Sequence, residues 1–251
     1  FSSNYALYGD MSRRAMNILN RFTPYVEIYS IDEAFLNFEG MNIPDYDNYG
    51  KQIKDTLLKG LSLPVCIGFA PTKALSKVAN KIARKYPERT NGVYVIDTEE
   101  KRIKALRWTK IEDVWGIGYR MKKKMKAKNI LTAYDFTEPF HESWVKKEMG
   151  VTGLRLRKEL LGESVLGIEE PGNKKSIAIT RSFPKQLTEF DALRERVSTF
   201  ASVCAEKLRA QDSCCHTVVV MLATMEHKTP ATKQYYHNAV TLPFGTDSTL
   251  T

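Results

Sequence analysis

Apolar positions in the first part of the chain follow two alternating patterns, one helical and one extended. Apolar residues that recur at three- and four-residue steps predict amphipathic helices over 4–22, 49–61 and 72–86. Short apolar or β-branched runs between them predict strands at 26–29, 34–38, 65–69 and 93–96. Because strands and helices alternate, we expect residues 1–97 to form a mixed sheet covered by helices.

The pattern changes after residue 97 and again before residue 176. No strand pattern appears between these points, so residues 98–165 are expected to form a small all-helical unit. A stretch containing Pro, Gly and Asn then marks 166–175 as a linker. Residues 176–251 are expected to form an α/β unit, which places the chain in the α+β class.

Within this last unit the pattern predicts one long helix and three strands. The helix is expected over 188–211, and Thr188 and Asp191 have the spacing of a capping box at its start. The strands are expected at 176–183, 216–222 and 237–242.

Positive charge is concentrated in one part of the sequence. The net charge is +9, and the window Lys101–Lys128 holds eleven Lys and Arg residues against Glu112 and Asp113, which accounts for the whole excess. A confined positive patch favours a polyanionic partner, nucleic acid before membrane.

No apolar run approaches the roughly 20 residues of a membrane span. The start is unlike a signal peptide, and the four cysteines show no metal-binding spacing, so a cytoplasmic location is expected.

Two adjacent acidic residues, Asp32 and Glu33, stand between the two strands of the predicted hairpin. Neighbouring carboxylates at a strand end repel each other and are costly to desolvate. A divalent cation would neutralise them, and hard cations such as Mg²⁺ prefer carboxylate oxygen. The alternative interpretation is a solvated hairpin tip, because turns favour Asp.

The predicted helix 72–86 carries a stripe of four lysines at consecutive four-residue steps, namely Lys73, Lys77, Lys81 and Lys85. Like charges at this spacing destabilise a helix by a few tenths of a kcal/mol per pair. The stripe therefore indicates that this face meets negative charge. The alternative is a solvated face that tolerates the repulsion.

The basic window contains a Gly-apolar-Gly turn between two predicted short helices, which is the pattern of a helix-hairpin-helix. Gly116 and Gly118 would let the backbone N–H groups at the start of the second helix hold a phosphate. Met121 and Met125 are expected to face inward. The lysines between and after them, Lys122, Lys123, Lys124 and Lys126, are expected to point toward a phosphate backbone. A helical hairpin that binds nothing is the alternative.

Taken together, the acidic hairpin, the lysine-striped helix and the basic helix-hairpin-helix resemble the Y-family translesion DNA polymerases, most closely the bacterial UmuC branch. The resemblance covers nearly the whole chain. It is carried by the segments Phe1-Ser-Ser-Asn-Tyr-Ala-Leu-Tyr8, Ser30-Ile-Asp-Glu-Ala-Phe35, Lys85-Tyr-Pro-Glu-Arg-Thr-Asn-Gly92, Val114-Trp-Gly-Ile-Gly118 and Gly150-Val-Thr-Gly-Leu-Arg-Leu156.

The resemblance implies a partial palm over 1–97, a thumb over 98–165 and an incomplete little finger over 176–251. It implies an error-prone polymerase acting in translesion synthesis and SOS DNA repair on primer–template DNA, with dNTP and two Mg²⁺ ions. Asp32 and Glu33 would be the catalytic metal ligands, and Lys85 would reach the triphosphate. The residues expected to contact DNA are Gly116, Gly118, Lys122, Lys123 and Arg181, the last of them on the strand 176–183.

The family's first metal-binding Asp, its sugar-discriminating aromatic residue and its fingers would lie upstream of Phe1. The chain as given is therefore expected to be a fragment that is catalytically inactive, although its parent is an enzyme.

The resemblance also suggests a UmuD-like accessory protein and a sliding clamp in the bacterial cytoplasm. Exposed sheet edge makes self-association plausible. Two alternatives remain: a non-catalytic helix-hairpin-helix DNA-binding module, and a nuclease that uses Asp32 and Glu33.

Overall fold

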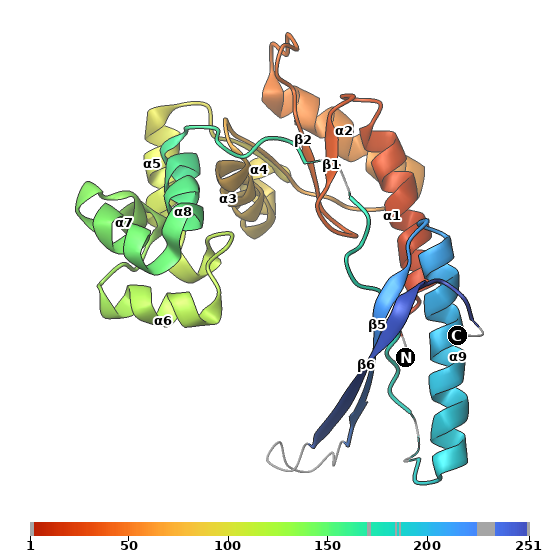
Figure 1. Ribbon diagram of the computed structural model, residues 1–251. Coiled ribbons are helices and arrows are strands. Elements are labelled where there is room, and N and C mark those ends of the chain that lie inside the picture. Colours follow the sequence, from red (N-terminus) through yellow and green to blue (C-terminus); the bar gives the residue numbers. More distant parts are fainter. Residues whose placement is uncertain (1–2, 170–171, 184, 186, 225–233, 250–251) are drawn as a thin grey trace. The chain divides into compact units, whose positions relative to one another are not determined.

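Three pairs of strands form the sheets of the computed structural model, which describes residues 3–169, 172–183, 185, 187–224 and 234–249. The pairs are antiparallel β1 (Val26–Ile28) with β2 (Ala34–Leu36), parallel β3 (Ile67–Phe69) with β4 (Val93–Val95), and antiparallel β5 (Cys215–Ala223) with β6 (Tyr235–Thr246) (Figure 1). The single mixed sheet expected over 1–97 is thus replaced by two separate pairs. No strand among the described residues joins β1–β2 to β3–β4.

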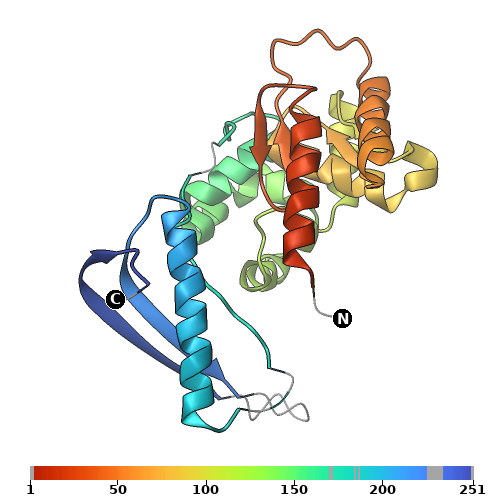
Figure 2. The ribbon, with the colours of Figure 1, turned by 90° about the vertical axis from the view of Figure 1, so that its right-hand side faces the viewer.

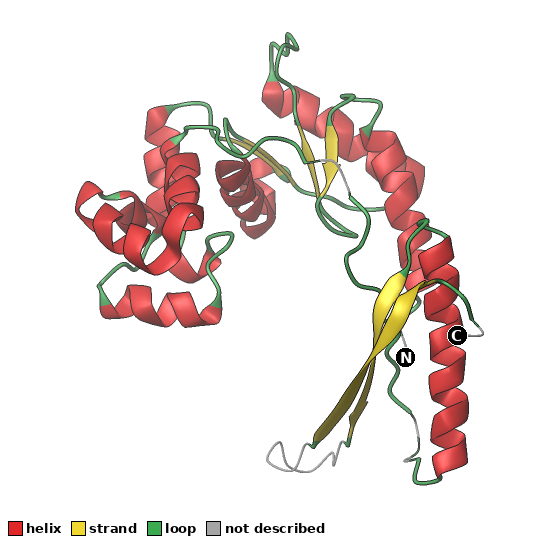
Figure 3. Cartoon of the chain, in the orientation of Figure 1, coloured by secondary structure: helices red, strands yellow, loops and turns green. Residues whose placement is uncertain are grey.

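The helices predicted in the first part are confirmed to within a few residues, as α1 (Tyr5–Leu19), α2 (Tyr46–Leu61) and α3 (Lys73–Lys85). The expectation that 98–165 contains helices without a strand ladder is also confirmed (Figure 3). The further helices of this part are α4 (Pro87–Thr90), α5 (Glu99–Trp108), η1 (Ile111–Asp113), α6 (Tyr119–Ala127), α7 (Ala133–Thr137), η2 (Pro139–His141) and α8 (Glu142–Leu161).

The apolar face of helix α3 lies in the larger of two cores. Leu75, Val78 and Ala79 on this face are buried. They belong to a cluster that continues through Met125 to Leu160, so the core crosses residue 97 without a break. As a result, residues 1–171 form one compact unit and 172–251 a second, and the division falls inside the predicted linker.

A smaller cluster lies between the β3–β4 pair and α1 and α2, and contains Ile53, Leu57, Phe69, Val93 and Val95. The pair β3–β4 is therefore covered by apolar side chains on both faces, as is usual for parallel strands. A glycine makes the packing on the α3 side possible. A Cβ at Gly68 would collide with backbone atoms of Ser76 and Asn80 in α3.

The second unit consists of α9 (Phe190–Arg209) running alongside the β5–β6 hairpin (Figure 2). The predicted helix and the two predicted hairpin strands are present, although β6 extends over 235–246 and not only over 237–242. Residues 176–183, however, form no strand, because no described segment offers this stretch a ladder of hydrogen bonds. The predicted capping box is also wrong. The N-cap is Glu189, which makes no side-chain cap hydrogen bond, and Thr188 lies one residue before it.

Among the described residues, no helix combines the length and the apolar character that crossing a membrane requires.

Candidate functional site

The acidic pair lies in the turn between β1 and β2, and the turn is closed by its own hydrogen bonds. The backbone N–H groups of Tyr29 and Ser30 both donate to the carbonyl oxygen of Glu33, at 3.0 Å each. The Ser30 hydroxyl donates to Asp32 Oδ1 at 2.6 Å. Asp32 and Glu33 are both exposed. The hairpin predicted from the sequence is therefore present, with both carboxylates open to a ligand.

One lysine of the α3 stripe contacts this turn directly. Lys77 Nζ lies 2.9 Å from Glu33 Oε1 and 4.2 Å from the centre of the Tyr29 ring. The ammonium group thus sits between a carboxylate and the electron-rich face of an aromatic ring, and both attract a cation. This contact brings the acidic turn and the lysine-striped helix together.

Two further stripe lysines also meet carboxylates of the same chain. Lys73 pairs with Glu27 on β1, and Lys81 Nζ lies 2.6 Å from Asp113 Oδ1. The expectation that this face meets negative charge is confirmed, and the charge comes from the protein itself. Lys85 differs from the other three, because it is exposed and makes no ion pair with any described residue.

An aromatic contact that the sequence reasoning missed ties the acidic turn to the glycine turn. Trp115 immediately precedes Gly116, and its Nε1–H donates to the Tyr29 hydroxyl at 2.8 Å. Its ring centre lies 5.6 Å from that of Tyr29 and 5.7 Å from that of Phe35. Trp115 is partly buried, packs against the larger core and connects the two loops. Its position just before the Gly-Ile-Gly turn is the only sequence signal that points to this role.

The glycine turn has the backbone geometry that its sequence predicts. Gly116 has a φ of +85°, a conformation that only glycine adopts without strain. Gly118 is the N-cap of α6 and provides no side-chain cap, so N–H groups of the first turn have no partner from a cap. The first helix of the expected helix-hairpin-helix is shorter than predicted, since η1 is a single 3₁₀ turn.

The lysines of α6 are largely engaged within the unit. Lys122 and Lys126 lie 3.2 and 2.6 Å from the two oxygens of Glu112, and Lys124 lies 2.6 Å from Glu148. Hydrogen bonds from Lys126 and then Lys122 hold the pKa of the Glu112 carboxyl below its ordinary value.

Lys123 and the two methionines of α6 differ in exposure. Lys123 is exposed and lies 4.6 Å from the ring centre of Tyr119. Met125 is fully buried and Met121 packs against the same core, so the predicted inward face is confirmed. Of the two lysines expected to contact DNA, Lys122 pairs with Glu112, whereas Lys123 makes no ion pair with any described residue.

The acidic turn offers two carboxylates to a metal ion. No group of three or more His, Cys, Asp or Glu side chains suited to a metal exists among the described residues. A pair of carboxylates nevertheless fits Mg²⁺, which proteins often hold with one or two carboxylates together with substrate phosphates. Asp32 and Glu33 thus have the donor chemistry of a magnesium site that a phosphate ligand completes.

Two predicted site residues make no contact among the described residues that joins them to this cluster: Lys85 lies further along α3, and Arg181 belongs to the second unit. Lys85 stands two turns of α3 beyond Lys77, about 12 Å along the helix axis. Arg181 belongs to the second unit and lies in a loop rather than on the expected strand. Its guanidinium donates to the carbonyl oxygen of Thr180 at 2.8 Å.

Comparison with known proteins gives matches along most of the chain. Models described as the impB/mucB/samB family and its C-terminal domain match residues 1–81 and 174–251. The UmuC protein of Salmonella typhimurium is 39% identical over 247 residues, which cover 96% of this chain and 58% of that protein. DNA polymerase IV of Oceanobacillus iheyensis is 24% identical over 241 residues, 94% of this chain and 56% of that protein.

Among solved structures, a Y-family DNA polymerase chimera, Dbh-Dpo4(243-245)-Dbh, has a similar fold. Its TM-score is 0.71 at 20% identity, and the match covers 96% of this chain and 67% of the chimera. The chain spans less than two thirds of the length of the two curated relatives.

Proposed function

Because this chain belongs to the impB/mucB/samB family of UmuC-like, Y-family proteins, we propose that the protein is a DNA-directed DNA polymerase that copies damaged template DNA. The reaction is nucleotidyl transfer from a dNTP to a primer, in translesion synthesis within the SOS response. One observation carries the proposal. The acidic turn, the lysine helix and the glycine turn, which are far apart in sequence, contact one another through Lys77, Tyr29 and Trp115.

Asp32 and Glu33 are proposed to hold two Mg²⁺ ions, which, when bound, would stabilise charge on the attacking and leaving oxygens. Lys77 positions Glu33 through their ion pair at 2.9 Å. Lys85 is proposed to bind the triphosphate, because it is the stripe lysine whose charge no described carboxylate neutralises.

The turn Gly116–Gly118 and the start of α6 are proposed to hold a phosphate of the DNA backbone. The start of α6 lacks a side-chain cap, and a Cβ at Gly118 would meet nothing within 4 Å, so the approach is open. Lys122, Lys123 and, in the second unit, Arg181 are proposed as further phosphate contacts. Contacts of this kind fix register and give sequence-independent, salt-sensitive binding.

The remaining parts of the proposal rest on the family relationship. They are an accessory protein of the UmuD type, a sliding clamp and a location in the bacterial cytoplasm. We expect that the 251-residue chain on its own does not extend a primer, because the described residues place only two carboxylates at the site. Self-association of this chain is proposed because β-strand edges without neighbours favour it.

Primer extension tests the proposal. The assay uses this chain together with any residues that flank it in the whole protein. Asp32→Ala is expected to reduce extension by more than about 100-fold, since even residues behind a metal's direct ligands are often worth 10- to 100-fold. DNA binding, measured by fluorescence anisotropy, is expected to stay within about threefold, because the phosphate contacts lie elsewhere. Glu39→Gln, an exposed acidic residue on the segment after β2, is the matched control.

The same assay separates the second candidate function, a DNA-binding module without catalysis. The observation that favours this candidate is the absence of a third metal-binding side chain beside Asp32 and Glu33 in the described parts of the chain. If Asp32→Ala left extension unchanged, or if the wild-type protein bound DNA but extended no primer, the module would be the correct description.

A further inference from the structure

The segment that follows α8, residues 163–169, is bound to the first unit along its backbone, and we call it the strap. Gly162, with a φ of +96°, ends α8 and turns the chain. The strap then runs from the end of α8 to β1 (Figure 1). It forms no helix or strand, so its backbone N–H groups need partners of another kind. Two buried glutamates of the first unit supply them.

Glu159, in the last turn of α8, holds the first part of the strap. Its side chain is fully buried, and one carboxylate oxygen accepts from the N–H groups of Val165 and Leu166, at 2.8 and 3.0 Å. The other oxygen accepts from the Ala74 N–H at the start of α3, at 3.2 Å. A buried carboxylate is costly unless it is hydrogen-bonded, and both oxygens of Glu159 are.

Glu27 on β1 holds the last residue of the strap. Its Oε2 accepts from the Glu169 N–H at 2.7 Å, and the same oxygen pairs with Lys73 of α3. The side chains of Glu27 and Lys73 are only 10% and 9% exposed, so this contact is shielded from water. Glu27 lies opposite Phe35 of β2 in the ladder. The strap therefore ends on the hairpin that carries the acidic turn.

The ion pair with Lys73 does not by itself explain a carboxylate at position 27. A buried ion pair often adds no more stability than apolar side chains of similar size, because both charges lose their water. An apolar side chain, however, could not accept the N–H of Glu169, whereas the carboxylate does. What the glutamate provides is therefore a fixed end for the strap.

We propose that Glu27 is a positioning residue, which fixes at β1 the point where the chain leaves the first unit for the second. The second unit begins at Gly172, three residues after Glu169 and six residues after Leu166. If Glu27 releases Glu169, the length of chain between the last anchored residue and the second unit doubles. Effective concentration falls as roughly the −3/2 power of linker length, so a DNA bound by both units would be held about threefold more weakly.

The consequence for DNA rests on the proposed function, in which both units contact the DNA backbone. The anchoring of the strap does not rest on it, because it is a set of hydrogen bonds within the first unit. The two parts are therefore tested by separate measurements.

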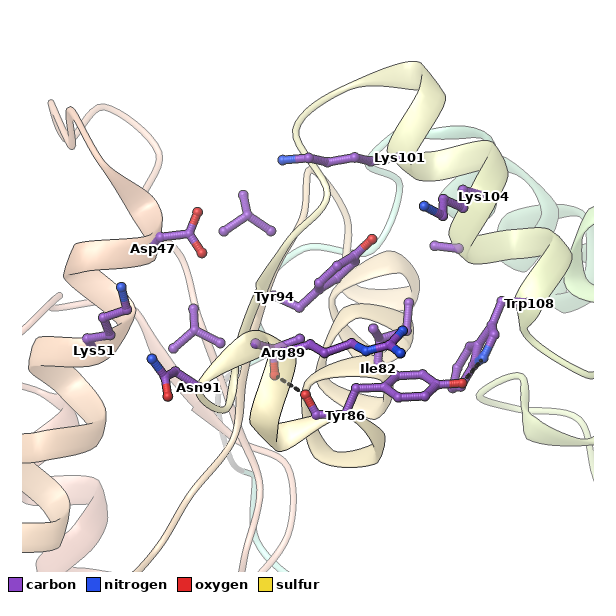
Figure 4. A pocket seen from close by; sticks show the side chains of 14 residues that line it. Asp47, Lys51, Ile82, Tyr86, Arg89, Asn91, Tyr94, Lys101, Lys104 and Trp108 are labelled. Carbon is purple, nitrogen blue, oxygen red and sulfur yellow. Dashed lines mark hydrogen bonds between the residues drawn. The ribbon is translucent and has the colours of Figure 1, made fainter.

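The strap is not a cover for the cavity between α2 and α5. This cavity has a volume of about 540 Å³, with Asp47 and Lys51 on one side and Lys101 and Lys104 on the other (Figure 4). Neither the strap nor the glutamates that hold it line the cavity. Releasing the strap would therefore lengthen the connection to the second unit without opening this cavity.

Two double variants of the 251-residue chain, which differ in one acceptor, test the anchor. Glu27→Leu with Lys73→Met removes both charges and the acceptor for Glu169. Glu27→Gln with Lys73→Met removes both charges and keeps a carbonyl acceptor of similar size. Amide exchange at Glu169, followed by NMR, should be at least about tenfold faster in the Leu variant than in the Gln variant. The Val165 amide, held by Glu159, is the internal control and should exchange equally in both.

Anisotropy with labelled primer–template DNA tests the positioning role in the same two variants, after circular dichroism has verified that both are folded. The Leu variant should bind about threefold more weakly than the Gln variant, which should bind like the wild-type protein. Equal exchange at Glu169 in the two folded variants would overturn the anchor. Faster exchange with equal DNA binding would overturn the positioning role. If the wild-type chain bound no DNA, the proposed function would fail, and the exchange at Glu169 would decide the anchor alone.

Discussion

At the scale of single residues, Lys77 and Trp115 organise the site. Lys77 binds Glu33 at the acidic turn, and Trp115 connects Tyr29 of the same hairpin to the glycine turn. Asp32, Glu33 and the lysine stripe could be predicted from the sequence, because their spacing and charge are local properties. The partners of Lys77 and Trp115 could not, because each of these contacts joins residues more than 40 positions apart.

The two glycines of the turn lead to a residue-scale prediction. Gly118 has an ordinary φ of −81° and open space around it, so Gly118→Ala should fold normally. If a phosphate lies against this turn, the added methyl group should weaken DNA binding about tenfold, roughly 1.4 kcal/mol. Anisotropy with labelled duplex DNA measures this change, and circular dichroism verifies the fold. If a folded Gly118→Ala protein bound DNA as tightly as the wild-type protein, this turn would not be a phosphate-binding site.

At the scale of elements, α3 determines how the first unit is built. Its apolar face was predicted from periodicity alone, and that face is buried. The sequence did not predict that the core on this face continues into the helices beyond residue 97, because periodicity shows that a face is buried but not what covers it. The same limit applies to 176–183, whose alternating pattern is not accompanied by a pairing strand.

Replacing glycine by alanine at two positions, Gly68 and Gly9, tests the close contact of α3 with β3. Gly68→Ala should destabilise the protein by about 2 kcal/mol or more, because the Cβ would collide with backbone of α3 that cannot yield easily. Gly9→Ala, at an exposed position inside α1 with nothing within 4 Å, should stabilise it by about 0.5–1 kcal/mol. Urea unfolding measures both, and a loss at Gly9 equal to that at Gly68 would contradict the close packing.

The ion pairs of α6 predict how stability depends on pH. The pKa of Glu112 lies below its ordinary value of 4.5, because Lys126 and Lys122 donate hydrogen bonds to the carboxylate. A carboxyl group whose pKa is lower in the folded state adds stability above its unfolded pKa, and this stability is lost as the pH falls through the folded pKa. The melting temperature should therefore decrease as the pH is lowered below about 4.5. This decrease should be smaller in the Glu112→Gln variant than in the wild-type protein. Equal losses in both proteins would show that the pair adds no stability.

At the scale of the whole molecule, the sequence predicted three units, over 1–97, 98–165 and 176–251, whereas the chain divides into two compact units, 1–171 and 172–251. The boundary at residue 171 lies where Pro, Gly and Asn interrupt every periodic pattern. The basic window Lys101–Lys128 was interpreted as a surface for a polyanion. The structure shows that acidic residues inside and outside the window pair with part of it, which the sum of charges cannot reveal.

The proposed reaction requires a metal ion at Asp32 and Glu33, next to Lys77 and Trp115. Paramagnetic Mn²⁺ is a suitable probe, because it binds the same oxygen ligands as Mg²⁺. In an NMR titration, Mn²⁺ should broaden the backbone signals of residues 30–34 and the indole N–H signal of Trp115 before other signals. The double variant Asp32→Asn, Glu33→Gln should abolish this broadening, and Glu39→Gln should leave it intact. Broadening that is spread over the protein, or that persists in the double variant, would contradict the assignment of the acidic turn as the metal site.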